Sequence, residues 1–340
     1  MSKLVVVNVG PATSIQDGGR FGTQRYGLPP SGAMDRVSLA VANCLAGNSG
    51  DGAAIEVGPL GATFTARDGA IRIALAGAAR QADIAGNPLA LNQTALIAEG
   101  ETLKLGAARG GVFSYLAVEG GIRGEPIFGS LSVNARSGIG SPYPRTLREN
   151  DEIIVGNASL APHERQLERP EPAKGAIRIV MGPQDDEFGE ARDLFLTSDW
   201  VISATSDRMG YRLEGPKIAH TKGHNIVSDG TVNGSIQVPG SGQPIVLMMD
   251  RGTTGGYPKI ATVIGADLGR FAQMPAGSKF RFAAISVEDA QVEARKLSTF
   301  LVSLPSLISP AGSANLNLDE LQRANVAGAA VNAIDGHDNL

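Results

Sequence analysis

Short apolar runs bounded by glycine, proline, asparagine or aspartate recur along the chain, and this pattern predicts a protein built mainly from short β-strands. The runs lie at residues 4–9, 71–75, 95–98, 112–118, 152–155, 176–181, 235–239, 245–249, 261–264 and 279–283. Gly86 and Asn87 separate two apolar stretches, which is typical of a two-residue hairpin turn. Segments with helical periodicity do not alternate with the strands, and this argues against a parallel α/β fold.

Helical periodicity is confined to four segments, at residues 35–45, 185–196, 286–300 and 316–334. In the first segment, Asp35 is placed to cap the N-terminus and Gly47 is placed to stop the helix. The third segment opens at Ser286 with Ser-Val-Glu-Asp, which resembles a capping box. The last is rich in Ala and Asn, and we expect a weaker terminal helix that packs on the body or on a neighbour.

A charged, proline-containing segment divides the chain near its middle. Residues 161–174 hold three prolines and six charged side chains, which is typical of a linker. We therefore expect one β-domain at residues 1–160, a second at residues 175–302 and a helical C-terminal extension at residues 303–340.

The two halves echo each other weakly. A helix candidate precedes residues 55–59 (Ile-Glu-Val-Gly-Pro) in the first half and residues 212–216 (Arg-Leu-Glu-Gly-Pro) in the second. The spacings differ, so an insertion in the first half is needed to align them. This echo favours a duplicated β-domain.

The composition of the 340 residues limits the function classes. A net charge of −4 and a pI near 5.7 give no electrostatic footprint for nucleic acid or an anionic membrane. Cys44 is the only cysteine, so the chain can form no intrachain disulfide and no cysteine cluster for zinc. The apolar runs are too short for a signal segment or a membrane span, and we expect a cytoplasmic protein.

Several familiar catalytic motifs are absent. His220 and His224 have i,i+4 spacing, but they lack the glutamate of zinc proteases, and a polar loop is the simpler interpretation than a metal site. The chain has no GxxxxGK[ST] phosphate loop, and residues 137–140 lack the serine-elbow pattern. No activated nucleophile is visible, which favours transfer through a cofactor or a partner.

Three clusters combine glycines with polar side chains, at residues 14–20 with 29–35, at 206–212 and at 250–260. Each can be a set of turns. The third, however, follows an apolar run and packs a carboxylate, two hydroxyls, a phenol and an ammonium around a Gly-Gly pair, more than a plain turn needs. Pro258 biases Tyr257 toward extended backbone, which fixes where the phenol points.

These residue types suit a small planar ligand that carries a carboxylate or a carbonyl. Arginine binds carboxylates through its planar fork. Backbone N–H groups at glycine-rich bends can hold a developing oxyanion, and a lysine or tyrosine can move a proton if the site tunes its pKa.

At these clusters the chain resembles the allophanate hydrolase subunit 2 or KipA-like family. The same family is also described as the biotin-dependent carboxyltransferase family, and it includes proteins like the C subunit of 5-oxoprolinase. The order and spacing of the matches agree over roughly residues 5 to 285. The matching stretches are residues 10–20, 27–35, 43 with 47–48, 54–56, 208–215 and 250–260. One residue departs from the family pattern, because Gly252 stands where the family usually has glutamine.

The resemblance implies a mainly β fold with two cyclophilin-like β-barrel domains, and a relation to the carboxyltransferase part of urea carboxylase. It implies pairing with a KipI-like (allophanate hydrolase subunit 1-like) small subunit. In some bacteria a LamB/YcsF-like protein joins the pair as an ATP-dependent 5-oxoprolinase. The chain has no biotin-attachment sequence and no recognisable ATP-grasp region. Biotin, as carboxybiotin, or ATP is therefore expected from partner chains such as a biotin carboxylase and carrier.

Two functions remain open at this stage. The first is an enzyme subunit acting on a small amide or ureido substrate, by ATP-dependent 5-oxoproline hydrolysis or by biotin-dependent carboxyl transfer. The second is a non-catalytic KipA-like protein that sequesters a KipI-like regulator.

For the enzyme we expect catalytic roles for Asp250, Tyr257 and Lys259, with Lys259 or Tyr257 as the proton carrier and no metal. Arg208 or Arg20 is the expected carboxylate anchor. The residues expected to bind substrate are Gln16, Asp17, Arg20, Arg208, Tyr211, Thr253, Thr254, Gly255 and Gly256.

Overall fold

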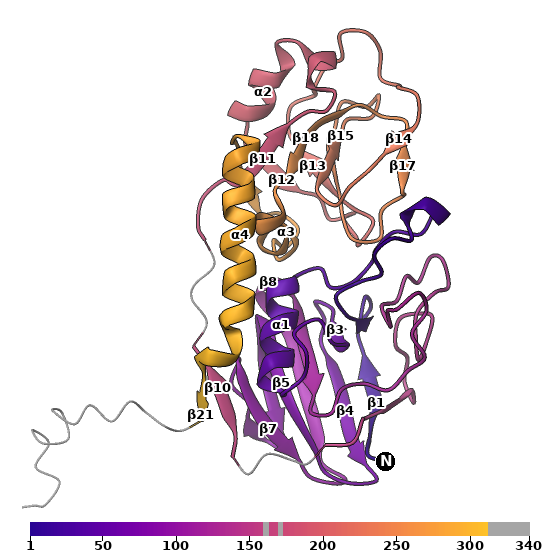
Figure 1. Cartoon of the computed structure of the whole chain (residues 1–340), viewed down its shortest axis with the longest axis vertical. Coiled ribbons are helices and arrows are strands. Elements are labelled where there is room, and N and C mark those ends of the chain that lie inside the picture. Colours follow the sequence, from indigo (N-terminus) through magenta and orange to yellow (C-terminus); the bar gives the residue numbers. More distant parts are fainter. Residues whose placement is uncertain (159–162, 169–172, 312–340) are drawn as a thin grey trace, which may run out of the picture.

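The structure is a computed structural model that describes residues 1–158, 163–168 and 173–311. Two lobes are stacked along its long axis, and each is built around a mainly antiparallel β-sheet (Figure 1). The predominance of strands confirms the mainly β prediction. The terminal helix expected at residues 316–334 lies outside the described residues.

The first lobe, at the bottom of Figure 1, contains an eleven-stranded sheet centred on the long antiparallel pair of β5 (Ile71–Ile84) and β8 (Thr102–Val118). Alternate side chains of these strands enter a closed apolar core, with Ile73 and Leu116 fully buried. The sheet runs through β21 (Ile308–Pro310), β10 (Arg165–Leu167), β7 (Gln93–Ile97), β5 (Ile71–Ile84), β8 (Thr102–Val118), β4 (Ala62–Arg67), β1 (Lys3–Val9) and β9 (Glu152–Ile154). At its side lie β2 (Ser14–Gln16), β3 (Ala54–Val57) and β6 (Asn87–Pro88).

The predicted strands of this lobe are confirmed, with two local differences. β5 pairs Ile84 with Asn87, so the hairpin turn is Ala85–Gly86, one residue earlier than predicted. The middle of the expected linker forms the short strand β10, which pairs with β7 and β21. Glu164, just before β10, accepts two hydrogen bonds from the buried guanidinium of Arg72 at 3.1 and 3.0 Å. Two of the charged residues in this segment, Glu164 and Arg165, are therefore bound to the sheet.

The second lobe contains an eight-stranded sheet in which only β11 and β20 run parallel. An aromatic cluster fills its core, where Phe195 packs on Trp200 and Phe282 with ring centroids 5.6 and 4.9 Å away. The sheet runs through β19 (Lys279–Phe280), β12 (Trp200–Ile202), β13 (Gly210–Glu214), β16 (Ile245–Leu247), β15 (Ser235–Gln237), β18 (Lys259–Val263), β11 (Ile177–Met181) and β20 (Phe282–Ala284). A separate ribbon joins β14 (Asp229–Gly230) and β17 (Thr254–Gly255).

Helices α1 (Arg36–Leu45) and α4 (Val287–Ser303) confirm their predicted starts. Oδ1 of Asp35 accepts from the N–H groups of Val37 and Ser38, and the hydroxyl of Ser286 accepts from the N–H of Asp289. The short 3₁₀ segments are η1 (Gln24–Tyr26) and η3 (Leu304–Leu307). No described helix combines the length and apolar composition that a membrane crossing requires.

Two helical features differ from the sequence prediction. The helix expected at residues 185–196 is broken at Gly189 into η2 (Asp185–Phe188) and α2 (Ala191–Thr197). Helix α3 (Gly265–Ala272) was not predicted, because its two glycines are poor helix formers. Its Asp267 accepts from the N–H and guanidinium of Arg178, which anchors the helix to the start of β11.

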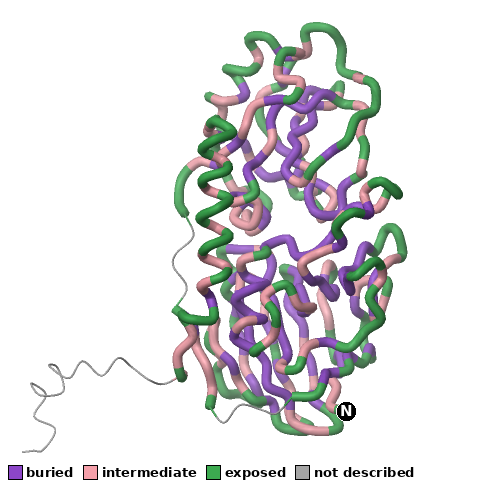
Figure 2. Tube along the Cα trace, viewed as in Figure 1, coloured by how far each residue is buried: buried purple, intermediate pink, exposed green. Residues whose placement is uncertain are grey.

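One apolar core joins the lobes. Leu39 of α1 and Tyr115 of β8 belong to the same buried cluster as Met248 and Phe271 of the second lobe. In Figure 2 this buried zone continues from the lower sheet toward the upper one, whereas α4 along the side is largely exposed. The lobes are thus held together by apolar packing together with polar contacts at their junction, in which Gln24, Arg208 and Gln273 are half-buried.

Candidate functional site

The glycine-rich stretch at residues 250–260 leaves β16 and continues into β17 and β18. In the β14–β17 ribbon, Gly255 lies opposite Asp229. A Cβ atom at Gly255 would lie 2.3 Å from Nε2 of Gln237, so a side chain at this position would displace the Gln237 amide. The two ends of the stretch have different neighbours, which divides the predicted catalytic residues into two groups.

Asp250 contacts Arg208 and, through it, the first lobe. Nε and Nη2 of Arg208 donate to the carboxylate oxygens of Asp250 at 2.8 and 3.2 Å. Nη1 donates to Oε1 of Glu56, and Nη2 also donates to the carbonyl of Gly32 at 2.7 Å. We call Glu56, Arg208 and Asp250 the inter-lobe clamp. The guanidinium expected to anchor a substrate carboxylate is therefore already held by two protein carboxylates.

Burial and charge determine the protonation of the inter-lobe clamp. Glu56 is 0 % exposed, and burial raises the pKa of this carboxyl above its ordinary value although Arg208 acts against the rise. Burial alone would lower the pKa of Arg208, but the neighbouring Asp250 and Glu56 raise it overall. Arg208 thus stays charged, while two buried carboxylates share this single cation.

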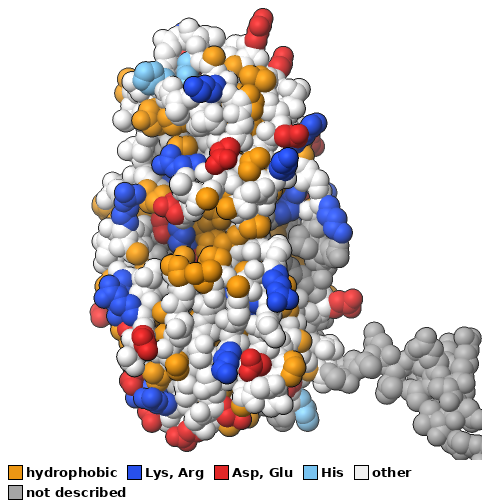
Figure 3. Space-filling view, turned by 180° about the vertical axis from the view of Figure 1, so that it is seen from behind, with side chains coloured by type: hydrophobic (Ala, Val, Ile, Leu, Met, Phe, Trp, Pro, Cys, Tyr) orange, Lys and Arg blue, Asp and Glu red, His pale blue; other side chains and the backbone are white. Residues whose placement is uncertain are grey.

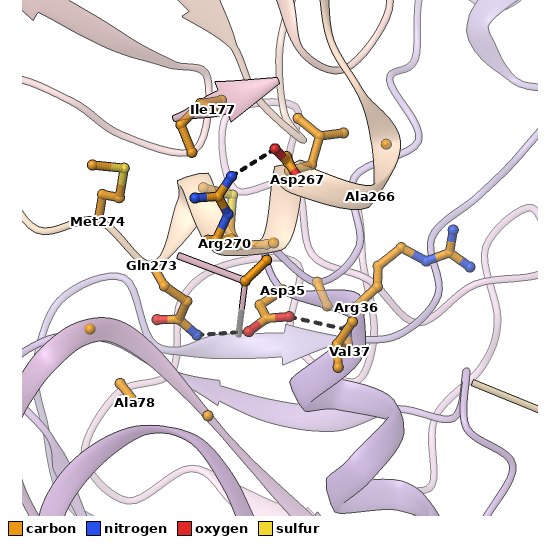
Figure 4. Close-up of a pocket in the computed structure, with 18 of the residues that line it drawn as sticks. Asp35, Arg36, Val37, Ala78, Ile177, Ala266, Asp267, Arg270, Gln273 and Met274 are labelled. Atoms are coloured by element: carbon orange, nitrogen blue, oxygen red, sulfur yellow. Dashed lines mark hydrogen bonds and ion pairs between the residues drawn. The ribbon is translucent and has the colours of Figure 1, made fainter. Parts of the chain in front are cut away.

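A second polar connection runs from Glu56 to α3. Oε2 of Glu56 accepts from the Tyr115 hydroxyl at 2.7 Å and from the N–H of Met34 at 2.8 Å. The Tyr115 oxygen accepts in turn from the N–H of Asp35 at 2.7 Å. Gln273, just after α3, donates to Oδ2 of Asp35 at 3.1 Å and also bonds the backbone of β8 (Figure 4). A continuous polar chain therefore connects the lobes.

Lys259 lies at the other end of the glycine-rich stretch and is 2 % exposed. Its ammonium donates to Oδ2 of Asp229 at 2.7 Å and to the carbonyl of Gly230 at 3.2 Å. The hydrogen bond from Lys259 lowers the pKa of Asp229 below its ordinary value. Lys259 is thus paired with the β14–β17 ribbon of its own lobe, whereas Asp250 is linked to the first lobe through Arg208.

Three predicted ligands of the first lobe brace the loop at residues 130–133. The Asp17 carboxylate accepts from the N–H groups of Gly19 and Leu131 at 2.8 and 2.6 Å. Gln16 and Arg20 donate to backbone carbonyls of the same loop. Burial lowers the pKa of Arg20, and the charges of Asp17 and Asp250 offset part of this effect. The N–H of Arg20 donates to the carbonyl of Pro30 at 2.8 Å, and the N–H of the next residue, Ser31, donates to the carbonyl of Met249. The cluster at residues 14–20 with 29–35 thus lies beside the start of the stretch at residues 250–260.

The remaining predicted ligands divide by exposure. Tyr211 is 4 % exposed, and its hydroxyl donates to the carbonyl of Ala272 at 2.7 Å inside the core. Tyr257 is 39 % exposed, and Thr254 is also exposed, whereas Thr253 and Gly256 are half-buried. Tyr257 and the two threonines are thus the predicted groups that a small ligand can reach.

A cleft of 1310 Å³ opens between the lobes beside this region. Figure 4 shows Asp35 and Gln273 directed toward each other on one side of it, with Asp267 and Arg270 of α3 above. Met249 and Ser31, next to the clamp, also line it. No group of three or more His, Cys, Asp or Glu suitable for a metal lies within the residues that the structure describes.

Sequence reasoning missed Glu56, Tyr115 and Gln273 as parts of the site. Glu56 lies in a stretch that carries the family resemblance. A lone carboxylate in an otherwise apolar strand could have identified it as a site residue. Tyr115 has the sequence context of any aromatic residue in a strand. Gln273 follows helix α3, which the apolar pattern did not predict.

Comparison with known proteins gives a family match and several relatives. The family model of the carboxyltransferase domain, subdomains A and B, matches residues 26–284. The chain is 38 % identical to the C subunit of 5-oxoprolinase from Escherichia coli over 290 residues, which cover 84 % of this chain and 93 % of that protein. It is 34 % identical to the corresponding C subunit from Haemophilus influenzae, over 89 % of this chain and 98 % of that one. A putative urea carboxylase of Emericella nidulans is 29 % identical, over 88 % of this chain and 26 % of that protein.

Two solved structures have the same fold. TTHA0988 superposes with a TM-score of 0.75 at 31 % identity and covers 83 % of this chain and 56 % of its own. Urea carboxylase of Kluyveromyces lactis superposes with a TM-score of 0.82 at 25 % identity and covers 89 % of this chain and 29 % of its own. The chain thus spans about half of TTHA0988 and less than a third of the urea carboxylase.

Proposed function

The chain belongs to the carboxyltransferase domain family, subdomains A and B, and on this basis we propose that it is the large subunit of a 5-oxoprolinase-type complex. Its reaction would be the ATP-dependent hydrolysis of 5-oxoproline, in which water opens the cyclic amide while ATP is converted to ADP and phosphate. The observation that carries the proposal is similarity to the C subunits of two 5-oxoprolinases over more than nine tenths of their length.

Partner chains supply what this chain does not. We propose a KipI-like small subunit and a LamB/YcsF-like protein as partners, with the ATP chemistry residing in the complex. A biotin carboxylase and carrier in their place would change the reaction to carboxyl transfer onto a ureido substrate. We also propose that the two sheets correspond to two cyclophilin-like barrels at residues 1–160 and 175–302.

The contacts of the clamp refine the proposed roles. Arg208 donates to both Asp250 and Glu56, so Arg208 and Asp250 position the glycine-rich stretch instead of contacting substrate. Tyr257 and the hydroxyls of Thr253 and Thr254 are the groups that contact it. Lys259 forms an ion pair with Asp229. When substrate binding separates this pair, the Lys259 ammonium becomes the proton carrier. Gln16, Asp17 and Arg20 shape the adjoining loop.

The test is reconstitution. The chain is co-expressed with the products of the neighbouring small-subunit genes, and ADP release that depends on 5-oxoproline is measured. Turnover that falls when Lys259 is replaced by Ala supports the proposal. A stoichiometric complex that turns over neither 5-oxoproline nor urea would favour the alternative, a KipA-like protein that sequesters a KipI-like regulator.

A further inference from the structure

The cleft between the lobes is larger than a small substrate needs. Its volume of 1310 Å³ exceeds the range of about 300–1,000 Å³ typical of small-molecule pockets. A single-ring substrate would leave most of it empty. A cleft of this size between two lobes suits a segment of another polypeptide.

One wall of the cleft is a face of α4 that the shared apolar core covers only in part. Leu297, Phe300 and Leu301 of α4 line the cleft together with Met274 and the exposed Ala79 of β5. No side chain of α4 is fully buried, and its residues outside the cleft lining are mostly polar, although Val287, Val292 and Val302 are exposed there. Figure 3 shows hydrophobic side chains gathered in a hollow at the level where the lobes meet, with Lys and Arg side chains near it.

The charge of the cleft is opposite to that of the protein. Seven Lys or Arg residues and three Asp residues line it, an excess of four positive charges, whereas the whole chain carries −4. Arg109 on β8 and Lys279 on β19 are both exposed, and neither forms an ion pair with a described residue. An apolar floor with a basic rim is complementary to an apolar segment with acidic flanks.

The cleft also adjoins the candidate site. Ser31 and Met249 line it, and the N–H of Ser31 donates to the carbonyl of Met249 at 3.2 Å. Met249 directly precedes Asp250 of the inter-lobe clamp. A chain seated in the cleft would therefore contact the segments that hold the glycine-rich stretch, and its arrival would complete the site.

We infer that the cleft is the docking surface for the small subunit of the complex, which inserts an apolar segment flanked by acidic side chains. This inference rests on the proposed function for the existence of that subunit. Supporting it, the chain matches only 56 % of TTHA0988, so that relative carries further polypeptide beside the shared fold.

A matched pair of variants on one helix tests the surface. Leu297→Glu places a carboxylate in the cleft, whereas Val292→Glu places one on the same helix outside it. Binding of the purified small subunit is measured by calorimetry, with thermal unfolding as the folding control. We expect Leu297→Glu to raise Kd at least about tenfold and Val292→Glu to leave it unchanged.

Charge reversal tests the chemistry of the occupant. The double variant Arg109→Glu/Lys279→Glu should weaken binding about tenfold at low salt, and the difference from wild type should shrink as salt is raised. Unchanged affinity in both Leu297→Glu and the double variant would overturn the docking surface while leaving the proposed function intact. A wild-type chain that does not bind the small subunit would overturn both.

Other occupants give distinct results. If Leu297→Glu abolished self-association of this chain and left small-subunit binding unchanged, the cleft would be an interface between two copies. A second outcome is that a chain ending at Ala311 binds the small subunit as wild type does, while Leu297→Glu abolishes binding of an added peptide of residues 312–340. The occupant would then be the chain's own C-terminal segment. Either result would contradict the inference.

Discussion

Glu56 and Glu214 lie in stretches that echo each other, yet they have opposite surroundings. Glu56 is fully buried in the inter-lobe clamp, whereas Glu214 at the end of β13 is exposed. Glu56 stands two residues before the glycine of its stretch, and Glu214 stands one residue before its glycine. β3 is buried at every position, whereas β13 exposes Arg212 and Glu214 on one face, so the burial of the whole strand decides the surroundings of the carboxylate. Similar local sequence therefore gives a structural charge in one lobe and a solvated charge in the other.

The largest expected effect comes from removing the Glu56 carboxylate, and removal of the Glu214 carboxylate is its control. Glu56→Ala leaves Arg208 with one carboxylate and deprives Tyr115 and the Met34 N–H of their acceptor, and we expect a loss of about 3–5 kcal/mol in unfolding free energy. Glu214→Ala should stay within about 0.5 kcal/mol of wild type. Urea denaturation of both variants measures the difference. Equal losses would show that the clamp does not stabilise the junction.

The two tyrosines Tyr257 and Tyr211 extend the comparison from stability to activity. Tyr257→Phe removes an accessible phenol, and in the reconstituted complex we expect turnover to fall about a hundredfold with stability unchanged. Tyr211→Phe removes a buried hydroxyl that donates to Ala272, which should cost about 1 kcal/mol and leave turnover near wild type. Steady-state assays and thermal unfolding separate the two outcomes. A fully active Tyr257→Phe complex would remove the proposed contact with substrate.

Two buried carboxylates, Glu56 and Asp267, should respond oppositely to pH. Asp267 is held by Arg178 and Arg270; although burial acts the other way, the hydrogen bonds and charges of these residues lower its pKa. Its stabilising contribution is present above its unfolded-state pKa and is lost as pH falls through the lowered native value. Glu56 has a raised native pKa, so its contribution is fully present below the unfolded value and is lost as pH rises through the native one.

The measurement is the stability of wild type minus that of Glu56→Gln, or of Asp267→Asn, across the acid range. From about pH 4 upward the first difference should decrease, because the Glu56 carboxyl ionises at a cost in the folded protein. The second should decrease as pH falls below about 4. Parallel curves for the two variants would contradict the assigned environments.

The smallest effect concerns Gly252, where the family resemblance leads us to expect glutamine. Gly252 is exposed, and a Cβ there would meet only the carbonyl of Thr254 at 3.2 Å. Gly252→Gln should therefore change stability by less than about 0.5 kcal/mol. We expect a change of KM without a large change of kcat, because the added amide would lie beside the accessible threonines. A large loss of stability would mean that this bend cannot accept a side chain.

Local patterns were sufficient for much of the fold. The apolar runs located most of the longer strands, and Asp35 and Ser286 identified the starts of α1 and α4 because capping depends on a few neighbouring residues. Helix α3 and strand β10 escaped prediction. Both are held by distant partners, Arg178 for the helix and Arg72 with β7 for the segment at the strand, which composition cannot reveal.

The sequence identified candidate clusters but not their contacts. The clusters from the two halves lie side by side, and their roles in binding stay predictions. Arg208 looked like a free guanidinium because Glu56 is 152 residues away in sequence. Long-range pairing of charges decides which side chains remain available to a ligand, and a single sequence does not show it.

The most direct test measures ADP release that depends on 5-oxoproline in complexes reconstituted with wild type, Glu56→Gln and Glu214→Gln. We predict turnover by wild type, the same turnover by Glu214→Gln, and a clear loss in Glu56→Gln, because the clamp holds the glycine-rich stretch in place. A correctly assembled wild-type complex without turnover would contradict the proposed function. Equal turnover by all three would contradict the role of the clamp.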